Sequence, residues 1–421
     1  MLVSRTARAL AVGLAAVTLA TACGAGGGSG GGDGNVTLNV NLFGNFGYQE
    51  LYDEYEKANP TVKIEERTAA YNDHHRNLAT HLATGNGAAD IEGVDTGFIA
   101  QMRNAGAQFT DLGKERESEY LPWKWQASLT KDGKQIGYGT DVGGLAICYR
   151  RDLFEKAGLP TERDEVSASW AEGWDKYIAA GRKYTEKAPE GTAFFDGGGA
   201  LYNAIIGQAP VGFYSEDDTV VVASNPEVRK AWDLVAEAVQ SNLSAKLVES
   251  SPEWNNGFAK GQFATIACPA WMMTKIKDQS ANASGKWDVA AVPGGGGNWG
   301  GSYLTVPKQG EHVEEAKKLA AWLTAPEQQA RVFTSQGSLP SIPALYDKPE
   351  IAQYKDPFFN NAPVGQIFTT SAKSLKPQYQ GPRTGDIQTT IRDGLVRIEQ
   401  GKQSSEQSWQ QTVSDVERLA K

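Results

Sequence analysis

Hydrophobic and polar positions alternate near the start of the chain in the way that predicts strands. In residues 36–42 an apolar residue occupies every second position, and Thr or Asn fills the positions between. An amphipathic stretch follows, with the Leu and two Tyr of residues 51–55 on one face. Val62 and Ile64 then begin a second alternating run. This order predicts a strand–helix–strand unit, which is a building block of parallel sheets.

The second half of the chain is mostly helical in its pattern. Asn225 and Pro226 are a typical N-cap and first helical residue. Thr324 and Ser404 each begin a capping box, which predicts the start of a further helix. Residues 142–149 are apolar apart from two glycines, so we expect one fully buried strand there. Because strand and helix signals interleave throughout, the pattern predicts the α/β fold class.

The N-terminal residues have the pattern of an export signal. Arg5 and Arg8 precede an apolar stretch at residues 9–19, and small residues at 20–22 lead to Cys23. Two kinds of processing fit this segment. Ala-x-Ala suits an ordinary signal peptidase, which would release a free protein. Small residues directly before a cysteine resemble the lipobox of bacterial lipoproteins, in which case the Cys23 thiol carries the lipid.

The segment after Cys23 favours the second alternative. Residues 24–34 contain eight glycines in eleven positions, which is typical of a flexible tether that spans about 20 Å. No later stretch reaches the roughly 18 consecutive apolar residues of a membrane span. We therefore expect residues 1–22 to be a lipoprotein signal peptide and residues 23–35 to be a lipidated tether. The rest of the chain would lie outside the cytoplasm, anchored to the cell membrane through lipid.

The net charge of the chain limits its possible binding partners. The 421 residues include 50 acidic and 41 basic ones, for a net charge of −9. This net charge argues against nucleic acid as a partner, because phosphates attract basic surfaces.

Besides Cys23 the chain has Cys148 and Cys268. In an oxidising compartment they can form a disulfide or remain two buried thiols, and the sequence leaves both possibilities open.

Motifs for catalysis or for metal binding do not stand out. His74, His75 and His81 have no Glu or Cys at metal-ligand spacing, so we interpret them as an exposed polar face. Residues 295–300 fit a dinucleotide fingerprint, but a strand-like run follows where phosphate binding needs a helix. A glycosidase needs two carboxylates about 5–10 Å apart, and no compact motif singles out such a pair. We expect no metal and no cofactor.

The aromatic residues are the informative group. The chain has 11 Trp, 15 Tyr and 14 Phe, and Trp254, Trp271 and Trp299 lie beside proline, glycine or polar residues outside helix-core spacing. Sugars present C–H faces that stack on aromatic rings, and their hydroxyls bond to carboxylates, amides and arginine. This pattern favours a sugar site that uses Trp271 and Trp299. The alternative for each Trp is packing in a core.

Five stretches of the chain carry a resemblance to a known family. They are residues 42–66 with "ANPTVKIE", residues 82–96 ("LATGNGAADIEGVDT"), residues 142–160 with "GGLAICYRRDLFEKAGLP", residues 258–273 ("FAKGQFATIACPAWMM") and residues 299–308 ("WGGSYLTVPK"). Together they resemble extracellular solute-binding proteins of carbohydrate ABC importers over nearly the whole mature chain. The likeness is greatest to actinobacterial lipoproteins that bind cellobiose and longer cello-oligosaccharides. Ala89 replaces the family's usual proline of "PDI".

The resemblance implies an α/β, two-lobe periplasmic-binding-protein-like fold with a ligand cleft between the lobes. One lobe would comprise residues 36–148 and 298–326, and the other residues 149–297 and 327–421. The protein would bind an oligosaccharide, cellobiose or cellotriose first of all, and deliver it to ABC permease subunits. It would act as a monomer and break no bond. A xylo-, chito- or malto-oligosaccharide is the alternative ligand.

Nine residues match cleft positions of this family. They are Asn45, Phe46 and Gly47 after the first strand, Asp95 and Asp141 beside strands, Trp271, Trp299, Ser302 and Arg383. The resemblance implies that the two Asp accept hydrogen bonds from sugar hydroxyls and that Trp271 stacks on a sugar ring. An Asp in such a place can also be a helix cap or a turn residue, and that alternative stays open.

Two other classes of protein also remain possible. A lipid-anchored glycosidase would hydrolyse the sugar that it binds. An adhesion or cell-wall scaffold protein would bind insoluble polymer but not a soluble di- or trisaccharide.

Overall fold

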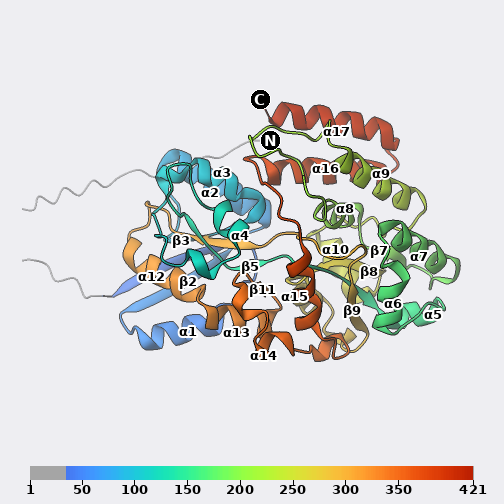
Figure 1. Ribbon diagram of the computed structural model, residues 1–421, viewed down its shortest axis with the longest axis horizontal. Coiled ribbons are helices and arrows are strands. Elements are labelled where there is room, and N and C mark those ends of the chain that lie inside the picture. The colour runs from blue at the N-terminus through green and yellow to red at the C-terminus, as the bar shows by residue number, and fades with distance from the viewer. Residues whose placement is uncertain (1–34, 421) are drawn as a thin grey trace, which may run out of the picture. The chain divides into compact units, whose positions relative to one another are not determined.

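Strands and helices alternate along the chain in the computed structural model, which describes residues 35–420 (Figure 1). The predicted signal peptide, the predicted lipidation site at Cys23 and nearly all of the predicted tether lie outside the described residues. The strands are β1 (Val36–Leu42), β2 (Val62–Thr68), β3 (Ile91–Asp95), β4 (Gly137–Gly139), β5 (Asp141–Val142), β6 (Leu145–Arg150), β7 (Ala193–Phe195), β8 (Phe263–Pro269), β9 (Trp287–Ala291), β10 (Ser302–Thr305) and β11 (Leu339–Pro340). The helices are α1 (Gln49–Ala58), α2 (Tyr71–Thr84), α3 (Thr96–Asn104), α4 (Pro122–Ala127), α5 (Arg151–Lys156), α6 (Arg163–Trp170), α7 (Trp174–Lys187), α8 (Gly198–Ile206), α9 (Pro226–Gln240), α10 (Pro252–Lys260), α11 (Met272–Gln279), α12 (Val313–Leu323), α13 (Pro326–Gln336), α14 (Pro349–Ala352), α15 (Val364–Ser374), α16 (Thr384–Glu399) and α17 (Ser405–Leu419).

The first sheet begins with the alternating residues that the sequence assigned to a strand. In β1, Leu38, Val40 and Leu42 are completely buried, whereas the residues between them are not. β1 pairs in parallel with β2 and with β3, and the full order of the sheet is β2-β1-β3-β10-β4. The predicted strand–helix–strand unit is therefore confirmed as β1, α1 and β2.

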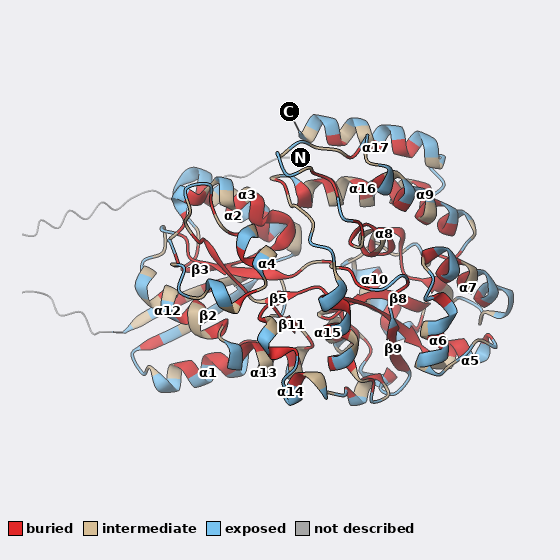
Figure 2. Cartoon of the chain, viewed as in Figure 1, coloured by how far each residue is buried: buried red, intermediate tan, exposed pale blue. Residues whose placement is uncertain are grey.

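The second sheet has the order β7-β8-β6-β9. One of its two middle strands, β6, runs antiparallel to both of its neighbours, and all six of its residues are buried. Helix α15 packs on β6 and β9, and α8 packs on β8. In Figure 2, β8 and β9 are largely red, while the helices around them carry pale-blue outer faces. The α/β fold class that the sequence predicted is confirmed.

The chain passes between the two sheets over a break in a predicted strand. Residues 142–149 do not form one strand. They are divided between β5, which pairs with β11 in a separate two-stranded sheet, and β6 of the second sheet, and the break falls at Gly143 and Gly144. A Cβ on Gly143 would lie 1.8 Å from the carbonyl oxygen of Trp299, so only glycine allows the two backbones to approach this closely. The Gly143 N–H donates to Asn298 Oδ1 over 2.9 Å, and its carbonyl accepts from the Trp299 N–H over 2.9 Å. The outgoing and returning connections are thus bonded to each other.

Cys148 and Cys268 form a disulfide bridge between β6 and β8. In the pairing of these strands Cys268 lies opposite Ala146, two residues from Cys148, and the two cysteine Cα atoms are 5.4 Å apart. Of the two possibilities that the sequence left open, the structure has the bridge rather than two separate thiols.

Local signals located some helix starts correctly. The Asn225 side chain accepts from the Glu227 N–H where α9 begins, and Ser404 and Gln407 form the predicted capping box of α17. The capping box predicted at Thr324 is wrong, because α13 begins at Pro326 without any side-chain cap.

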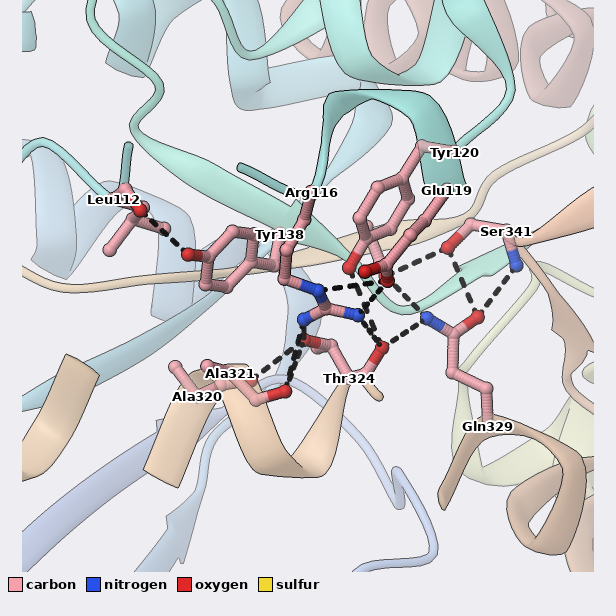
Figure 3. Close-up of polar contacts among 11 residues, drawn as sticks. Leu112, Arg116, Glu119, Tyr120, Tyr138, Ala320, Ala321, Thr324, Gln329 and Ser341 are labelled. Atoms are coloured by element: carbon pink, nitrogen blue, oxygen red, sulfur yellow. Dashed lines mark hydrogen bonds and ion pairs between the residues drawn. The ribbon is translucent and has the colours of Figure 1, made fainter. Parts of the chain in front are cut away.

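Thr324 belongs instead to a polar cluster around Arg116, which is drawn in Figure 3. Its hydroxyl donates to the Ala320 carbonyl over 2.7 Å and accepts from Arg116 Nη1 over 2.9 Å. The Arg116 guanidinium also lies over the rings of Tyr120 and Tyr138, with its central carbon 5.2 and 5.0 Å from the ring centres. A hydrogen bond with Arg116, 208 residues away in the sequence, therefore takes the place of the local cap.

None of the helices within residues 35–420 combines the length and the apolar character needed to cross a bilayer.

Candidate functional site

A cavity of about 700 Å³ opens where the two sheets and the connections between them meet. Its wall includes residues that follow β1, β3 and β8, residues of the glycine-rich connection from β9 to β10, and one face of α16. Cavities of about 300–1,000 Å³ are typical of sites for small molecules. Seven of the nine residues that the sequence suggested line this cavity; they are Asn45, Phe46, Asp95, Asp141, Trp271, Trp299 and Ser302.

Asp95 lies at the C-terminal end of β3 and caps α3. Its Oδ1 accepts from the Gly97 N–H over 2.7 Å and from the Tyr71 hydroxyl over 2.9 Å. Within residues 35–420 no donor lies at hydrogen-bond distance from Oδ2, which therefore keeps its capacity to accept from a ligand. Burial raises the pKa of the Asp95 carboxyl to about 6, although the two hydrogen bonds act in the opposite direction. Oδ1 of Asp95 thus caps α3, while Oδ2 is left to contact a ligand.

Asp141, in β5, is held beside Asp95 through Ser302 of the first sheet. Ser302 lies opposite Asp95 in the pairing of β10 with β3, and its N–H donates to Asp141 Oδ1 over 2.9 Å. The sequence did not single out Lys124, which is completely buried near the two Asp. Its Nζ lies 3.3 Å from Thr96 Oγ1 and 3.9 Å from the centre of the Tyr303 ring. Burial lowers the pKa of the Lys124 ammonium to about 8, and the two Asp act in the opposite direction. A buried cation thus balances part of the negative charge.

The predicted exposed polar face of histidines on α2 is wrong for two of its members. His74 and His75 do not form an exposed polar face, since only 4% and 1% of their surfaces are accessible. His75 Nε2 accepts from the Asp95 N–H over 3.0 Å, and Nδ1 donates to the Tyr71 carbonyl over 2.7 Å. Burial lowers the pKa of His75 to about 3, so the ring is neutral and fits these two bonds. His75 therefore positions both Asp95 and Tyr71. No cluster of metal-binding side chains occurs among the described residues.

Two tryptophans meet edge to face at the cavity. The Trp271 and Trp299 ring centres are 5.5 Å apart at an interplanar angle of 74°, and Trp271 Nε1 donates to the Trp299 carbonyl over 3.1 Å. Trp271 is half-buried, but only 9% of Trp299 is accessible. Trp254 also reaches the wall, yet it is almost fully buried and donates from Nε1 to Asp196 over 2.7 Å. Trp254 is thus mainly a core residue.

Two of the suggested residues lie away from the cavity wall. Gly47 has a φ of 76° and donates its N–H to Asn45 Oδ1 over 2.9 Å, so it shapes the turn that presents Asn45. Arg383 is the residue before α16, where it pairs with Asp386 at 3.1 Å. The wall is instead formed by the next residues of that helix, at helical spacing; they are Gly385, Gln388, Thr389 and Arg392.

The charged residues of the wall are mostly acidic. The acidic ones are Asp73, Asp95, Asp141, Glu249 and Asp278, and the basic ones are Arg76, Lys275 and Arg392. Sequence reasoning missed most of them, and also missed Tyr71, because the segments that carry them are far apart along the chain. An acidic wall with aromatic rings and side-chain amides suits a neutral ligand that is rich in hydroxyl groups.

Comparison with known proteins identifies the family. A family model described as "Bacterial extracellular solute-binding protein" matches residues 50–360. The chain belongs to this family. A crystal structure titled as an extracellular solute-binding protein of family 1 is 45% identical, covers 92% of this chain and 100% of its own, and superimposes with a TM-score of 0.79. The family assignment and the periplasmic-binding-protein-like fold that the resemblance implied are therefore confirmed, and the family is extracytoplasmic.

Two further relatives are described by what they bind. An arabinooligosaccharide-binding protein of Bacillus subtilis (strain 168) is 25% identical over 361 residues, which are 79% of each chain. A transporter-associated binding protein of B. animalis subsp. lactis Bl-04, in complex with β-1,6-galactobiose, is 18% identical, covers 91% of this chain and 97% of its own, and has a TM-score of 0.79, which shows a shared fold. The narrower likeness to cellobiose-binding lipoproteins stays a prediction.

Proposed function

We propose that this solute-binding protein binds a neutral oligosaccharide outside the membrane and delivers it to the permease of an ABC importer. One observation carries the proposal: a cavity of about 700 Å³ brings together Trp271 and two carboxylates, Asp95 and Asp141, from different parts of the chain. An indole stacks on the C–H face of a sugar, and a carboxylate accepts from its hydroxyls. The relatives that are described as binding arabinooligosaccharides and galactobiose support the same ligand class.

The transport step would depend on closure of two lobes around the sugar. The proposed lobes are residues 36–148 with 298–326, and residues 149–297 with 327–421. The connections that bond at Gly143 and Trp299 would then act as the hinge. A sugar that contacts both lobes favours the closed state by its difference in affinity for the two states. The permease would recognise the closed protein.

The sugar and the anchor belong to the same proposal. Cellobiose or cellotriose is the proposed ligand on the resemblance of the sequence, and arabino-, xylo-, chito- and malto-oligosaccharides are the alternatives. The chain would be held at the membrane by lipid on Cys23, act as a monomer and need no cofactor.

Calorimetric titration of the mature protein with soluble sugars tests this function. The panel contains cellobiose, cellotriose, arabinotriose, β-1,6-galactobiose, xylotriose, chitobiose and maltotriose. We expect saturable one-to-one binding of at least one of them, without products after hours of incubation. Hydrolysis of the bound sugar would instead identify a glycosidase, and binding to insoluble polymer alone would identify a wall-binding protein.

A further inference from the structure

The segment between α9 and α10 contains an unusual loop at the cavity wall. Lys246 and Ser250 are not glycines, yet they have φ values of 58° and 66°. Residues other than glycine rarely adopt this left-handed backbone conformation, and it persists only where surrounding contacts enforce it. The residues between these two positions include Glu249, which lines the cavity together with Ser250.

Contacts on both sides hold this loop in place. On one side the Lys246 N–H donates to Ser244 Oγ over 2.9 Å, and Ser244 Oγ donates to Glu399 over 2.6 Å. The Leu247 N–H donates to the Asp196 carbonyl over 3.0 Å. On the other side Ser251 caps α10 by accepting from the Trp254 N–H over 3.1 Å. The position of Glu249 is thus determined by its neighbours rather than by a contact of its own.

The Glu249 carboxylate has no partner within the part of the chain that the structure describes. No donor lies at hydrogen-bond distance from it, and no cation forms an ion pair with it. Burial raises the pKa of Glu249 to about 7, the nearby Arg392 and Lys275 act in the opposite direction, and Asp95 adds to the rise. A carboxylate that lines a cavity and has no donor in the protein is free to accept hydrogen bonds from a bound molecule.

We propose that Glu249 is a specificity-determining residue of the sugar site, which accepts hydrogen bonds from hydroxyls of a neutral sugar unit. This inference rests on the proposed function. Glu249 lies in the segment after α9, which pairs with β7 of the second sheet through Ser244, whereas Asp95 ends β3 of the first sheet. A sugar bound by both carboxylates would therefore join segments that belong to the two sheets. Arg392 and Lys275 lie near Glu249 and offset part of its negative charge, so the specificity that Glu249 supplies is for a hydroxyl at one position of the sugar.

The test compares Glu249→Gln with Glu253→Gln. Both variants remove one negative charge with little change in shape, but Glu253 is exposed on α10 and does not line the cavity. Each variant and the wild type are titrated by calorimetry with cellotriose and with arabinotriose, and the thermal unfolding of each is measured without sugar. We expect Glu249→Gln to bind about ten- to a hundred-fold more weakly, as for loss of a charge-assisted hydrogen bond. Glu253→Gln should bind as the wild type does, and neither variant should unfold at a lower temperature.

A second arm identifies the hydroxyl by using monodeoxy forms of the same two sugars. One of them should lose affinity for the wild type and lose little further for Glu249→Gln. Wild-type affinity in Glu249→Gln would overturn the assignment and leave the proposed function intact. A lowered unfolding temperature of that variant would also overturn it, by making Glu249 a structural residue. Failure of the wild type to bind any soluble sugar would overturn the proposed function itself.

Discussion

Replacement of Trp271 by alanine should weaken sugar binding much more than it weakens the fold. Trp271 is half-buried, and its indole packs on Trp299 at the cavity. Stacking contributes about 0.5–1.5 kcal/mol beyond area burial, and the apolar area covered by a sugar adds about 1–1.5 kcal/mol at about 25 cal/mol per Å². We therefore expect a loss of about 1.5–3 kcal/mol in binding, which is about a 10- to 150-fold rise in Kd.

The sequence suggested the same behaviour for Trp299, and the structure changes that expectation. Only 9% of Trp299 is accessible, so Trp299→Ala removes a ring from the protein interior. Such replacements cost about 3–5 kcal/mol of folding free energy. Trp299→Ala should therefore lower both the stability of the sugar-free protein and its affinity for sugar.

Calorimetric titration with cellotriose and arabinotriose, together with thermal unfolding of the sugar-free protein, separates these effects. Trp322→Ala is the matched control, because Trp322 is also partly buried but packs on Tyr55 outside the cavity wall. Trp271→Phe keeps an aromatic face and should recover most of the affinity. The reasoning would be refuted if Trp271→Ala unfolded many degrees early while its folded fraction bound sugar normally.

Three further predictions concern charges and the disulfide. Asp95→Asn should bind sugar about ten- to a hundred-fold more weakly in calorimetry, since a charge-assisted hydrogen bond becomes a neutral one; unchanged affinity would remove Asp95 from the site. Serine at both Cys148 and Cys268 should lower the free energy of unfolding in urea by about 4–5 kcal/mol in the chain-entropy model, because the bridge spans 120 residues; an unchanged midpoint would contradict this. Burial raises the pKa of Asp196 to about 7, above its usual value. The folded state therefore binds more protons between about pH 4 and pH 7, and wild-type stability relative to Asp196→Asn should fall as the pH rises through this window. Equal pH dependence of the two unfolding temperatures would show that Asp196 ionises normally.

Several features were predictable because their causes lie within a few residues. The alternation in β1 marks a strand with one face in the core, and the Ser404–Gln407 box closes within one helical turn. The family resemblance pointed to Asn45, Asp95 and Trp271, which line the cavity. The alternation of strand and helix signals was enough to predict the α/β fold class.

The remaining features depended on contacts between distant segments. The strand expected over residues 142–149 breaks where the Trp299 backbone approaches Gly143, and the hydroxyl of Thr324 is taken by Arg116. Glu249 reaches the cavity from a loop that contacts with distant segments hold in place and in which Lys246 and Ser250 have positive φ values. The sequence by itself thus determined the local elements and the family, since hydrophobic periodicity and capping act over one or two turns. Only the tertiary structure decided the partners of each polar group, because burial and hydrogen bonding are set by whichever segments the fold brings together.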